Sequence, residues 1–476
     1  MIREELDNRD YTFTDSHFIG SVTLRNTIVA NGSTIMLMDE NRLLSANQIN
    51  RPMRPTDSPS RWHKHKKTII VCIASVIVVG VVAGSYVYYK QTGHPPGQRE
   101  AKTSTAEQEG KNYSNGKCSG NEVKKLTHLP LDAENITNVL PYGGVVGAHI
   151  MPISHAYIWP GKQGDPRDKY NVYAMADSTL YSISSRSINV DSNRPKQAEY
   201  QLGFSVSCVE FYYYDLMTSL TPELQKALDS HPAQDPRGNS VGVNIPVKAG
   251  QLLGKIGSQT LDYAVWDFNK TLTGYVVPEH YDGDKPRTHL VSPFDYVTDD
   301  VRQALLSKLV RSVEPLAGKV DYDIDGKLIG GWFQDGTGGY SGTSGNNGSF
   351  RYWAGHLAIV PDDIDPTMML ISTGTYISDK EAQFAIAPEA NDPKTVGVDT
   401  GLVKYDLFQI DHIKADGSPW NRFDPSPGLK GKPSGQSSGC ALFQLVETRK
   451  LKVEFTPGKV CASTLGFSAA FKTYGR

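Results

Sequence analysis

The chain has 476 residues, which is long enough for two or three domains that each bury a core of their own. Its 49 Lys and Arg residues nearly balance its 51 Asp and Glu residues, and the resulting net charge of −2 excludes a nucleic-acid-binding protein that relies on a basic surface. The 44 glycines and 28 prolines, together with many Tyr, Val and Thr residues, are typical of strands joined by turns. We therefore expect a mostly β protein.

An uncharged apolar run, TIIVCIASVIVVGVVAGSYVYY, covers residues 68–89. A helix of this length can cross a bilayer core of about 30 Å, whereas the apolar part of a cleaved signal peptide has only about 7 to 15 residues. A cleaved signal and a buried core helix are the two alternatives. Four basic side chains come shortly before the run, namely Arg61, Lys64, Lys66 and Lys67. By the positive-inside rule, residues 1–67 should be a cytoplasmic tail and the chain beyond residue 89 should be extracytoplasmic.

The next stretch, residues 90–127, is polar and rich in Gly, Ser, Glu and Lys, with almost no large apolar residue. This composition favours a flexible stalk. Apolar residues, turns and prolines become frequent from about residue 128 onward. A folded domain should therefore begin there.

Four cysteines follow the apolar run, namely Cys118, Cys208, Cys440 and Cys461. An even number of cysteines suits an oxidising compartment and allows three disulfide pairings. The most natural pair is Cys440 with Cys461, because both flank one predicted hairpin. Buried free thiols are the alternative.

The most informative stretch is VGVNIPVKAGQLLGKIGSQTLDYAVWDF, residues 241–268. Gly250 marks a turn between two short strands, and TLDYAVWD should form the next strand. This order resembles the M23 (lysostaphin-like, LytM) zinc peptidases, in which a V-K-A-G-Q-x-I-G-x-x-G hairpin precedes a strand that ends in H-L-H-F-E-V. Residues 170–184 and 200–220 resemble the strands that come before this hairpin in the family. The resemblance implies an antiparallel β sandwich, which we assign to residues 128–311.

The resemblance also points to a site whose metal ligands are mostly absent. His155 matches the first histidine of the family's H-x-x-x-D motif, but Trp159 replaces its aspartate. Thr260 and Asp262 replace the two histidines of H-x-H, and no histidine occurs around Asp215, where the family has Y-x-H-L. We therefore expect no catalytic residue and no cofactor. The candidate binding residues are His155, Trp159, Asp215, Thr260, Asp262 and Tyr263.

A rearranged zinc site is the alternative for these residues. An uninterrupted strand would place His149 and His155 on one face, and Asp262 opposite them would complete a set of two histidines and one carboxylate. Pro152 should interrupt that strand. Several aromatic residues should converge near the same place and could stack on sugar rings, although packing in a β core would explain them as well. They are Tyr157, Trp159, Tyr212, Tyr213, Tyr214, Tyr263 and Trp266.

The first domain should end in an amphipathic linking helix at residues 301–313, and residues 312–476 should form a second β domain. We expect a single-span membrane protein whose exported part has a binding or assembly role at the cell envelope. Its partners would be a cell-wall polymer, a glycan or an envelope protein, with no nucleic acid among them. The alternatives are a zinc-dependent peptidoglycan hydrolase with altered ligands and a regulatory partner of a true hydrolase.

Overall fold

The computed structural model of the chain describes residues 29–30, 33–34, 105–188, 197–231, 238–342 and 351–476. The expected membrane span at residues 68–89 lies outside this part. None of the described helices is long and apolar enough to cross a membrane. The chain divides into two compact units, one of which is Ile19–Thr103. Of that unit, the structure describes only the antiparallel pair β1 (Val29–Ala30) and β2 (Ser33–Thr34).

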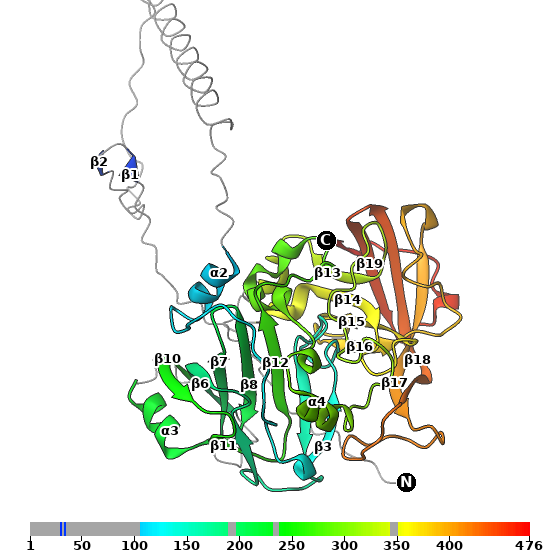
Figure 1. The fold of residues 1–476 in the computed structure, drawn as a ribbon. Helices are drawn as coiled ribbons and strands as arrows, with labels where there is room; N and C mark the ends of the chain where they lie inside the picture. The colour runs from blue at the N-terminus through cyan, green and yellow to red at the C-terminus, as the bar shows by residue number, and fades with distance from the viewer. Residues whose placement is uncertain (1–28, 31–32, 35–104, 189–196, 232–237, 343–350) are drawn as a thin grey trace, which may run out of the picture. The chain divides into compact units, whose positions relative to one another are not determined.

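The first half of the other unit consists of two antiparallel sheets, and the prediction of a mostly β chain is confirmed (Figure 1). The larger sheet has the order β10-β6-β7-β8-β12-β4-β3, and the smaller has the order β5-β11-β9. The larger sheet comprises β3 (Ile136–Leu140), β4 (Ala156–Pro160), β6 (Ser178–Ile188), β7 (Gln197–Ser205), β8 (Glu210–Met217), β10 (Gly238–Val247) and β12 (Leu261–Asp267). The smaller comprises β5 (Tyr170–Tyr173), β9 (Ser219–Leu220) and β11 (Leu252–Ile256).

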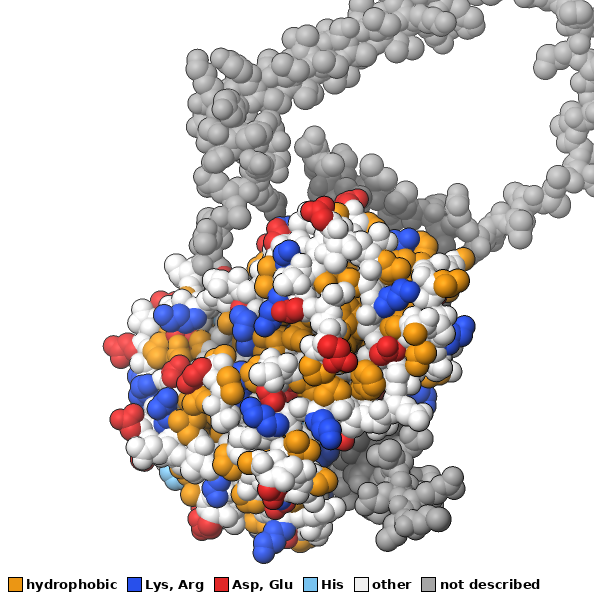
Figure 2. Space-filling model, turned by 90° about the vertical axis from the view of Figure 1, so that its right-hand side faces the viewer, with side chains coloured by type: hydrophobic (Ala, Val, Ile, Leu, Met, Phe, Trp, Pro, Cys, Tyr) orange, Lys and Arg blue, Asp and Glu red, His pale blue; other side chains and the backbone are white. Residues whose placement is uncertain are grey.

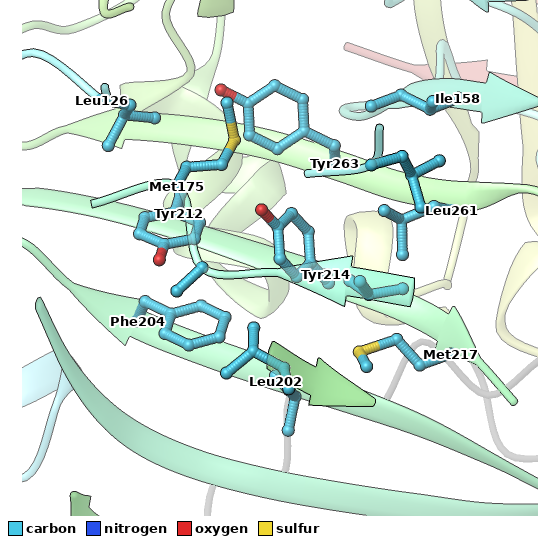
Figure 3. Packing of buried hydrophobic residues seen from close by; sticks show 14 of the residues in the cluster. Leu126, Ile158, Met175, Leu202, Phe204, Tyr212, Tyr214, Met217, Leu261 and Tyr263 are labelled. Carbon is cyan, nitrogen blue, oxygen red and sulfur yellow. The ribbon is translucent and has the colours of Figure 1, made fainter. Parts of the chain in front are cut away.

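A hydrophobic core fills the space between these two sheets, with Val172 and Leu253 from the smaller sheet and Leu202 and Tyr214 from the larger (Figure 3). Side chains of a strand alternate between its two faces, so every second residue of β12 points into this core. These residues are Leu261, Tyr263 and Val265, whereas Asp262, Ala264 and Trp266 belong to the opposite face. The alternation of β12 thus separates a core face from an outer face.

The predicted hairpin around Gly250 is a turn, but its two strands lie in different sheets. Gly250 has a φ of 78°, as a tight turn requires. The strand before it, β10, pairs with β6 in the larger sheet, whereas β11 after it pairs with β5 and β9 in the smaller one. The chain therefore crosses from one layer to the other here, because the apolar residues of the two strands cover the same core from opposite sides.

The stalk expected at residues 90–127 is folded from residue 105 onward, which corrects that prediction. Helix α2 (Ala106–Tyr113) lies on the larger sheet, and the Tyr113 ring contacts Phe211 and Phe268 at centroid distances of 5.2 and 5.6 Å. A Cβ on Gly110 would lie 1.7 Å from the backbone oxygen of Cys208, so only glycine fits this approach. Most residues of this helix are polar, which is why composition did not reveal that it is folded.

Further contacts fix the chain that follows α2. A disulfide joins Cys118 to Cys208, and the pair Cys440–Cys461 is also formed. The backbone N–H of Lys124 donates to Glu210 Oε2 at 2.6 Å. Burial raises the pKa of Glu210 to about 7. The segment before residue 128 thus belongs to the folded domain.

The linking helix is shorter than expected, since α4 spans Asp299–Leu306. A turn at Ser307 and Lys308 follows it, and Leu309 then forms a parallel bridge with Val139 of the edge strand β3. The other helices of this region are α3 (Pro222–Asp229), η1 (Ala133–Asn135), η2 (Pro278–His289) and η3 (Pro293–Asp295). The linker therefore covers the sheet edge with backbone hydrogen bonds rather than with a helix face.

The second half of this unit is a closed barrel of eight antiparallel strands, where the sequence had indicated only a second β domain. Its strands are β13 (Gly330–Gln334), β14 (His356–Pro361), β15 (Met369–Thr373), β16 (Ala382–Ala385), β17 (Val403–Ile413), β18 (Lys430–Glu447), β19 (Lys450–Pro457) and β20 (Lys472–Gly475). Its short helices are η4 (Gly339–Ser341), η5 (Tyr352–Gly355), η6 (Val398–Thr400) and η7 (Cys461–Ser463).

Side chains fill the barrel interior, as eight strands allow. Trp332 is fully buried there, and the Arg476 guanidinium lies over its ring at 4.0 Å. Arg476 also donates from Nε to Gly331 O at 3.1 Å and from Nη1 to Ile324 O at 3.0 Å. This arginine therefore ties β20 to the residues in and before β13.

The barrel packs against the outer face of the larger sheet through a second hydrophobic core. Ala264 and Trp266 of β12 belong to this core together with Val360 and Leu370 on the outside of the barrel. The segment 141–154 contributes Val145, Ala148, Ile150 and Met151 to it. One side of the larger sheet is thus covered by the smaller sheet, and much of the other by the barrel.

Candidate functional site

The sequence-predicted site lies on the outer face of the larger sheet. His155 immediately precedes β4, and Asp262 lies in β12. The strand register places Asp262 opposite Tyr157 of β4 on one side and opposite Asp215 of β8 on the other. Directly opposed residues of antiparallel strands share a face, so the structure brings His155, Asp262 and Asp215 to one region.

The centre of this region is a buried pair of His155 and Asp262. Their Nε2 and Oδ2 atoms are 3.3 Å apart, and Thr260 Oγ1 donates to Asp262 Oδ1 at 3.3 Å. All three residues are buried, with exposed fractions of 7% or less. The rings of Tyr157 and Tyr213 lie at 5.0 and 6.2 Å from the His155 ring. A histidine enclosed by a carboxylate and two aromatic rings is held in one orientation.

The alternative metal set of His149, His155 and Asp262 is not assembled. Within the described residues, no three His, Cys, Asp or Glu side chains are grouped so that they could hold a metal ion. His149 bridges to Val146 within a tight turn, and its ring lies 5.8 Å from that of His155. The chain between the two histidines is not a continuous strand, which agrees with the interruption expected at Pro152.

Trp159, at the position of the family's aspartate, takes part in the contact with the barrel. Its ring lies 5.2 Å from that of Phe423 and 5.2 Å from the guanidinium of Arg422, both in the β17–β18 connection. Beside it, Asn138 Nδ2 donates to the backbone oxygens of Arg422 and Asp424 at 2.7 and 3.0 Å. An indole offers only an N–H donor, so this position cannot ligate a metal.

Asp215 is held by an arginine that sequence reasoning missed. Arg186 of β6 donates to both carboxylate oxygens of Asp215 at 2.9 Å and to Glu199 Oε2 at 3.1 Å. Gln201 Nε2 donates to Asp215 at 3.3 Å. Burial by itself would lower the pKa of Arg186, but Asp215 and Glu199 raise it above its usual value. A fixed guanidinium therefore occupies the neighbourhood of Asp215, where the resembling family has a histidine and this sequence has none.

In the sequence, the polar SSRS segment is the one signal that points to Arg186, because its ion-pair partners lie in other strands. It lies directly opposite Glu199 in the β6–β7 register. Asp215 is one strand further away, in β8. This ion cluster depends on how β6, β7 and β8 pair, and that pairing cannot be predicted from the sequence.

Tyr263 does not belong to this site, which corrects its inclusion among the candidate residues. Its side chain points into the core between the two sheets, as do Tyr212 and Tyr214. Burial raises the pKa of Tyr263 well above its usual value. Tyr213 lies on the outer face instead and stacks on Trp266 at 5.0 Å. Strand alternation thus divides the expected aromatic group between two faces.

Replacing Arg186 with methionine should lower the free energy of unfolding by about 2 to 3 kcal/mol, because two buried carboxylates lose their common cation. The loss stays below the range for a fully buried pair, since the Arg186 side chain is 20% exposed. Lys248→Met is the matched control. Lys248 pairs with Asp177 where the two side chains are 79% and 62% exposed, so its removal should cost about 0 to 1 kcal/mol. Equal losses in denaturant unfolding would contradict a structural role for the Arg186 cluster.

Comparison with known proteins gives little beyond this geometry. No family model matches the chain, and no curated protein matches it. Among solved structures, the NMR solution structure of lysostaphin matches with 11% sequence identity, over 75% of this chain and 92% of that chain. The TM-score is 0.18, so this likeness supports no argument about the fold or the site.

Proposed function

We propose that residues 128–311 form a degenerate M23-like domain that binds or helps to assemble components of the cell envelope and catalyses no hydrolysis. The observation that carries this proposal is the set of side chains at the expected ligand positions. Trp159 packs on Phe423, and Asp215 is neutralised by Arg186. Only His155 and Asp262 offer metal donors.

The residues present do not fit a catalytic zinc. Such a site needs three protein ligands of His, Asp, Glu or Cys type and an open position for water. His155 and Asp262 provide two donors, and each is buried among protein groups. The third position is an indole. Both carboxylate oxygens of Asp215 already accept hydrogen bonds from Arg186, so a divalent cation would have to displace this arginine.

The binding role rests on the half-buried aromatic side chains beside this pair. Tyr157 and Tyr213 flank His155 on the outer face and keep part of their surface exposed. Tyrosines of this kind stack on sugar rings or apolar groups and hydrogen-bond through their hydroxyls. A cell-wall polymer, a glycan and an envelope protein all offer such groups. We place this region outside the cytoplasm, anchored by the span proposed for residues 68–89.

Binding can be tested by cosedimentation of the full-length protein with isolated cell-wall polymer. Tyr157→Ala should weaken retention about tenfold, which corresponds to ~1.4 kcal/mol of lost contact. Tyr173→Ala is the control, because Tyr173 is also half-buried but lies in the smaller sheet. Recovery of a specific envelope protein after cross-linking, with no retention on polymer, would favour the regulatory-partner alternative. Retention that is unchanged by Tyr157→Ala would contradict this binding face.

A further inference from the structure

The connection between β19 and β20, residues 458–471, carries several exposed apolar side chains. Leu465 is 96% exposed, Val460 is 47% exposed and Phe471 is 38% exposed. Ala462, Ala469 and Ala470 in the same segment are exposed as well. Scattered apolar residues on a surface are ordinary, whereas a cluster of them on one loop marks an interaction site.

This apolar loop is held in place by contacts at both of its ends. Its first half is fixed by the disulfide Cys440–Cys461 and by the Lys404 ammonium, which donates to Leu465 O at 3.2 Å. Its second half is fixed by Glu454, which accepts hydrogen bonds from Ser468 N at 2.7 Å and from Ser468 Oγ at 2.6 Å. The loop is thus ordered before it meets a partner, so little conformational entropy is lost on binding.

The charges around the apolar loop are mainly positive. Four lysines surround it, namely Lys404, Lys452, Lys459 and Lys472. None of these four lies within ion-pair distance of a carboxylate in the described part of the chain. The Lys452 ammonium lies over the Phe471 ring at 4.0 Å and near the Phe467 ring at 4.9 Å. Asp406 is engaged with the loop backbone, because its Oδ1 accepts from Cys461 N at 2.8 Å.

We infer that the apolar loop, residues 458–471, rests on the surface of a membrane that contains anionic lipids. Leu465, Val460 and Phe471 would enter the interfacial layer, while Lys459 and Lys472 face the headgroups. Apolar side chains that protrude among uncompensated lysines match this surface, since lysines near an anionic membrane attract it and apolar groups then insert. Figure 2 looks onto the side of the molecule that carries β17, β18 and β19 in Figure 1, and it shows hydrophobic side chains gathered there with both basic and acidic side chains around them.

A fluorescent label at position 465 tests this inference in the full chain. Cys72→Ser removes the one cysteine outside the two disulfides, and Leu465→Cys then provides a single thiol for an environment-sensitive dye. The labelled protein is reconstituted in vesicles of phosphatidylcholine alone or of phosphatidylcholine and phosphatidylglycerol in equal parts. Val398→Cys is the matched control, because Val398 is 42% exposed elsewhere on the barrel.

We expect the dye at position 465 to shift to shorter emission wavelengths and to be quenched by spin-labelled lipid only in the anionic vesicles. The dye at position 398 should do neither. Lys459→Gln and Lys472→Gln should each lower the ratio of inserted to free loop about fivefold, the equivalent of ~1 kcal/mol per lysine. An emission spectrum that stays water-like in both kinds of vesicle would overturn the inference. So would a shift that grows with protein concentration without anionic lipid, because that result would show contact with a second copy of the chain.

Discussion

Replacing Arg287 with methionine should lower the free energy of unfolding by about 4 kcal/mol, because this arginine joins η2 to the segment 141–154 and to η4 of the barrel region. It is 3% exposed. Its guanidinium donates to Asp284 Oδ2 at 2.9 Å, to Pro152 O at 2.6 Å and to Tyr340 Oη at 2.8 Å. Breaking a buried ion pair from one side typically costs about 3 to 5 kcal/mol.

The surroundings of Arg287 are buried and aromatic. The guanidinium lies 4.5 Å from the Tyr340 ring, and that ring stacks on His356 at 5.3 Å. Burial lowers the pKa of His356 to about 3, so this histidine is neutral in the folded protein at ordinary pH. Water therefore cannot replace the lost hydrogen bonds without opening the contact between the barrel and the sheet.

Arg449→Met is the control for this measurement. Arg449 makes a two-pronged ion pair with Asp325, yet both side chains are nearly half exposed, so its loss should cost at most about 1 kcal/mol. Unfolding in urea, followed by tryptophan fluorescence, gives both values. If Arg287→Met proved as mild as Arg449→Met, the two β regions would not be joined through this arginine.

Replacing both Cys118 and Cys208 with serine should lower stability by about 4 to 5 kcal/mol. The disulfide closes a loop of 90 residues, and the chain entropy that it removes from the unfolded state grows with the logarithm of loop length. The same change at Cys440 and Cys461, which are 21 residues apart, should cost only about 3 kcal/mol.

Limited proteolysis distinguishes this effect from a general loss of stability. Without the Cys118–Cys208 bond, the segment of α2 loses its covalent link to the sheet and keeps only non-covalent contacts, among them the packing of Tyr113 and Gly110, so cleavage should appear first between residues 105 and 117. The variant at Cys440 and Cys461 should be cleaved near residues 458–471 instead. Equal stability losses and identical cleavage sites in the two variants would contradict the assignment of α2 to the folded domain.

The sequence predicted those features that depend on local alternation. The alternation in TLDYAVWD predicts a strand, and β12 spans Leu261–Asp267. Its alternation also separates Asp262 from Tyr263, so the placement of Tyr263 on the core face could have been predicted from periodicity. The family resemblance concerns the order of residues and not the face on which each one lies, so it does not separate Tyr263 from Asp262.

The features that the sequence did not reveal depend on long-range pairing. Arg186 meets Asp215 and Glu199 only because β6, β7 and β8 are adjacent in the order of the sheet. Trp159 meets Phe423, which lies more than 260 residues further along the chain. Closure of the barrel requires β20 to pair with β13. These two strands are far apart in the sequence, so no short turn between them predicts the contact.

We propose that the site around His155 and Asp262 performs no metal-dependent hydrolysis. The most direct test measures zinc by elemental analysis in full-length protein purified without chelator, and in parallel follows the turbidity of a cell-wall suspension. Two donors and an indole fall short of the three ligands that an open catalytic zinc needs. We therefore predict no stoichiometric zinc and no clearing of the suspension. About one zinc per chain, lost together with clearing activity in His155→Ala, would contradict the account and establish the hydrolase alternative.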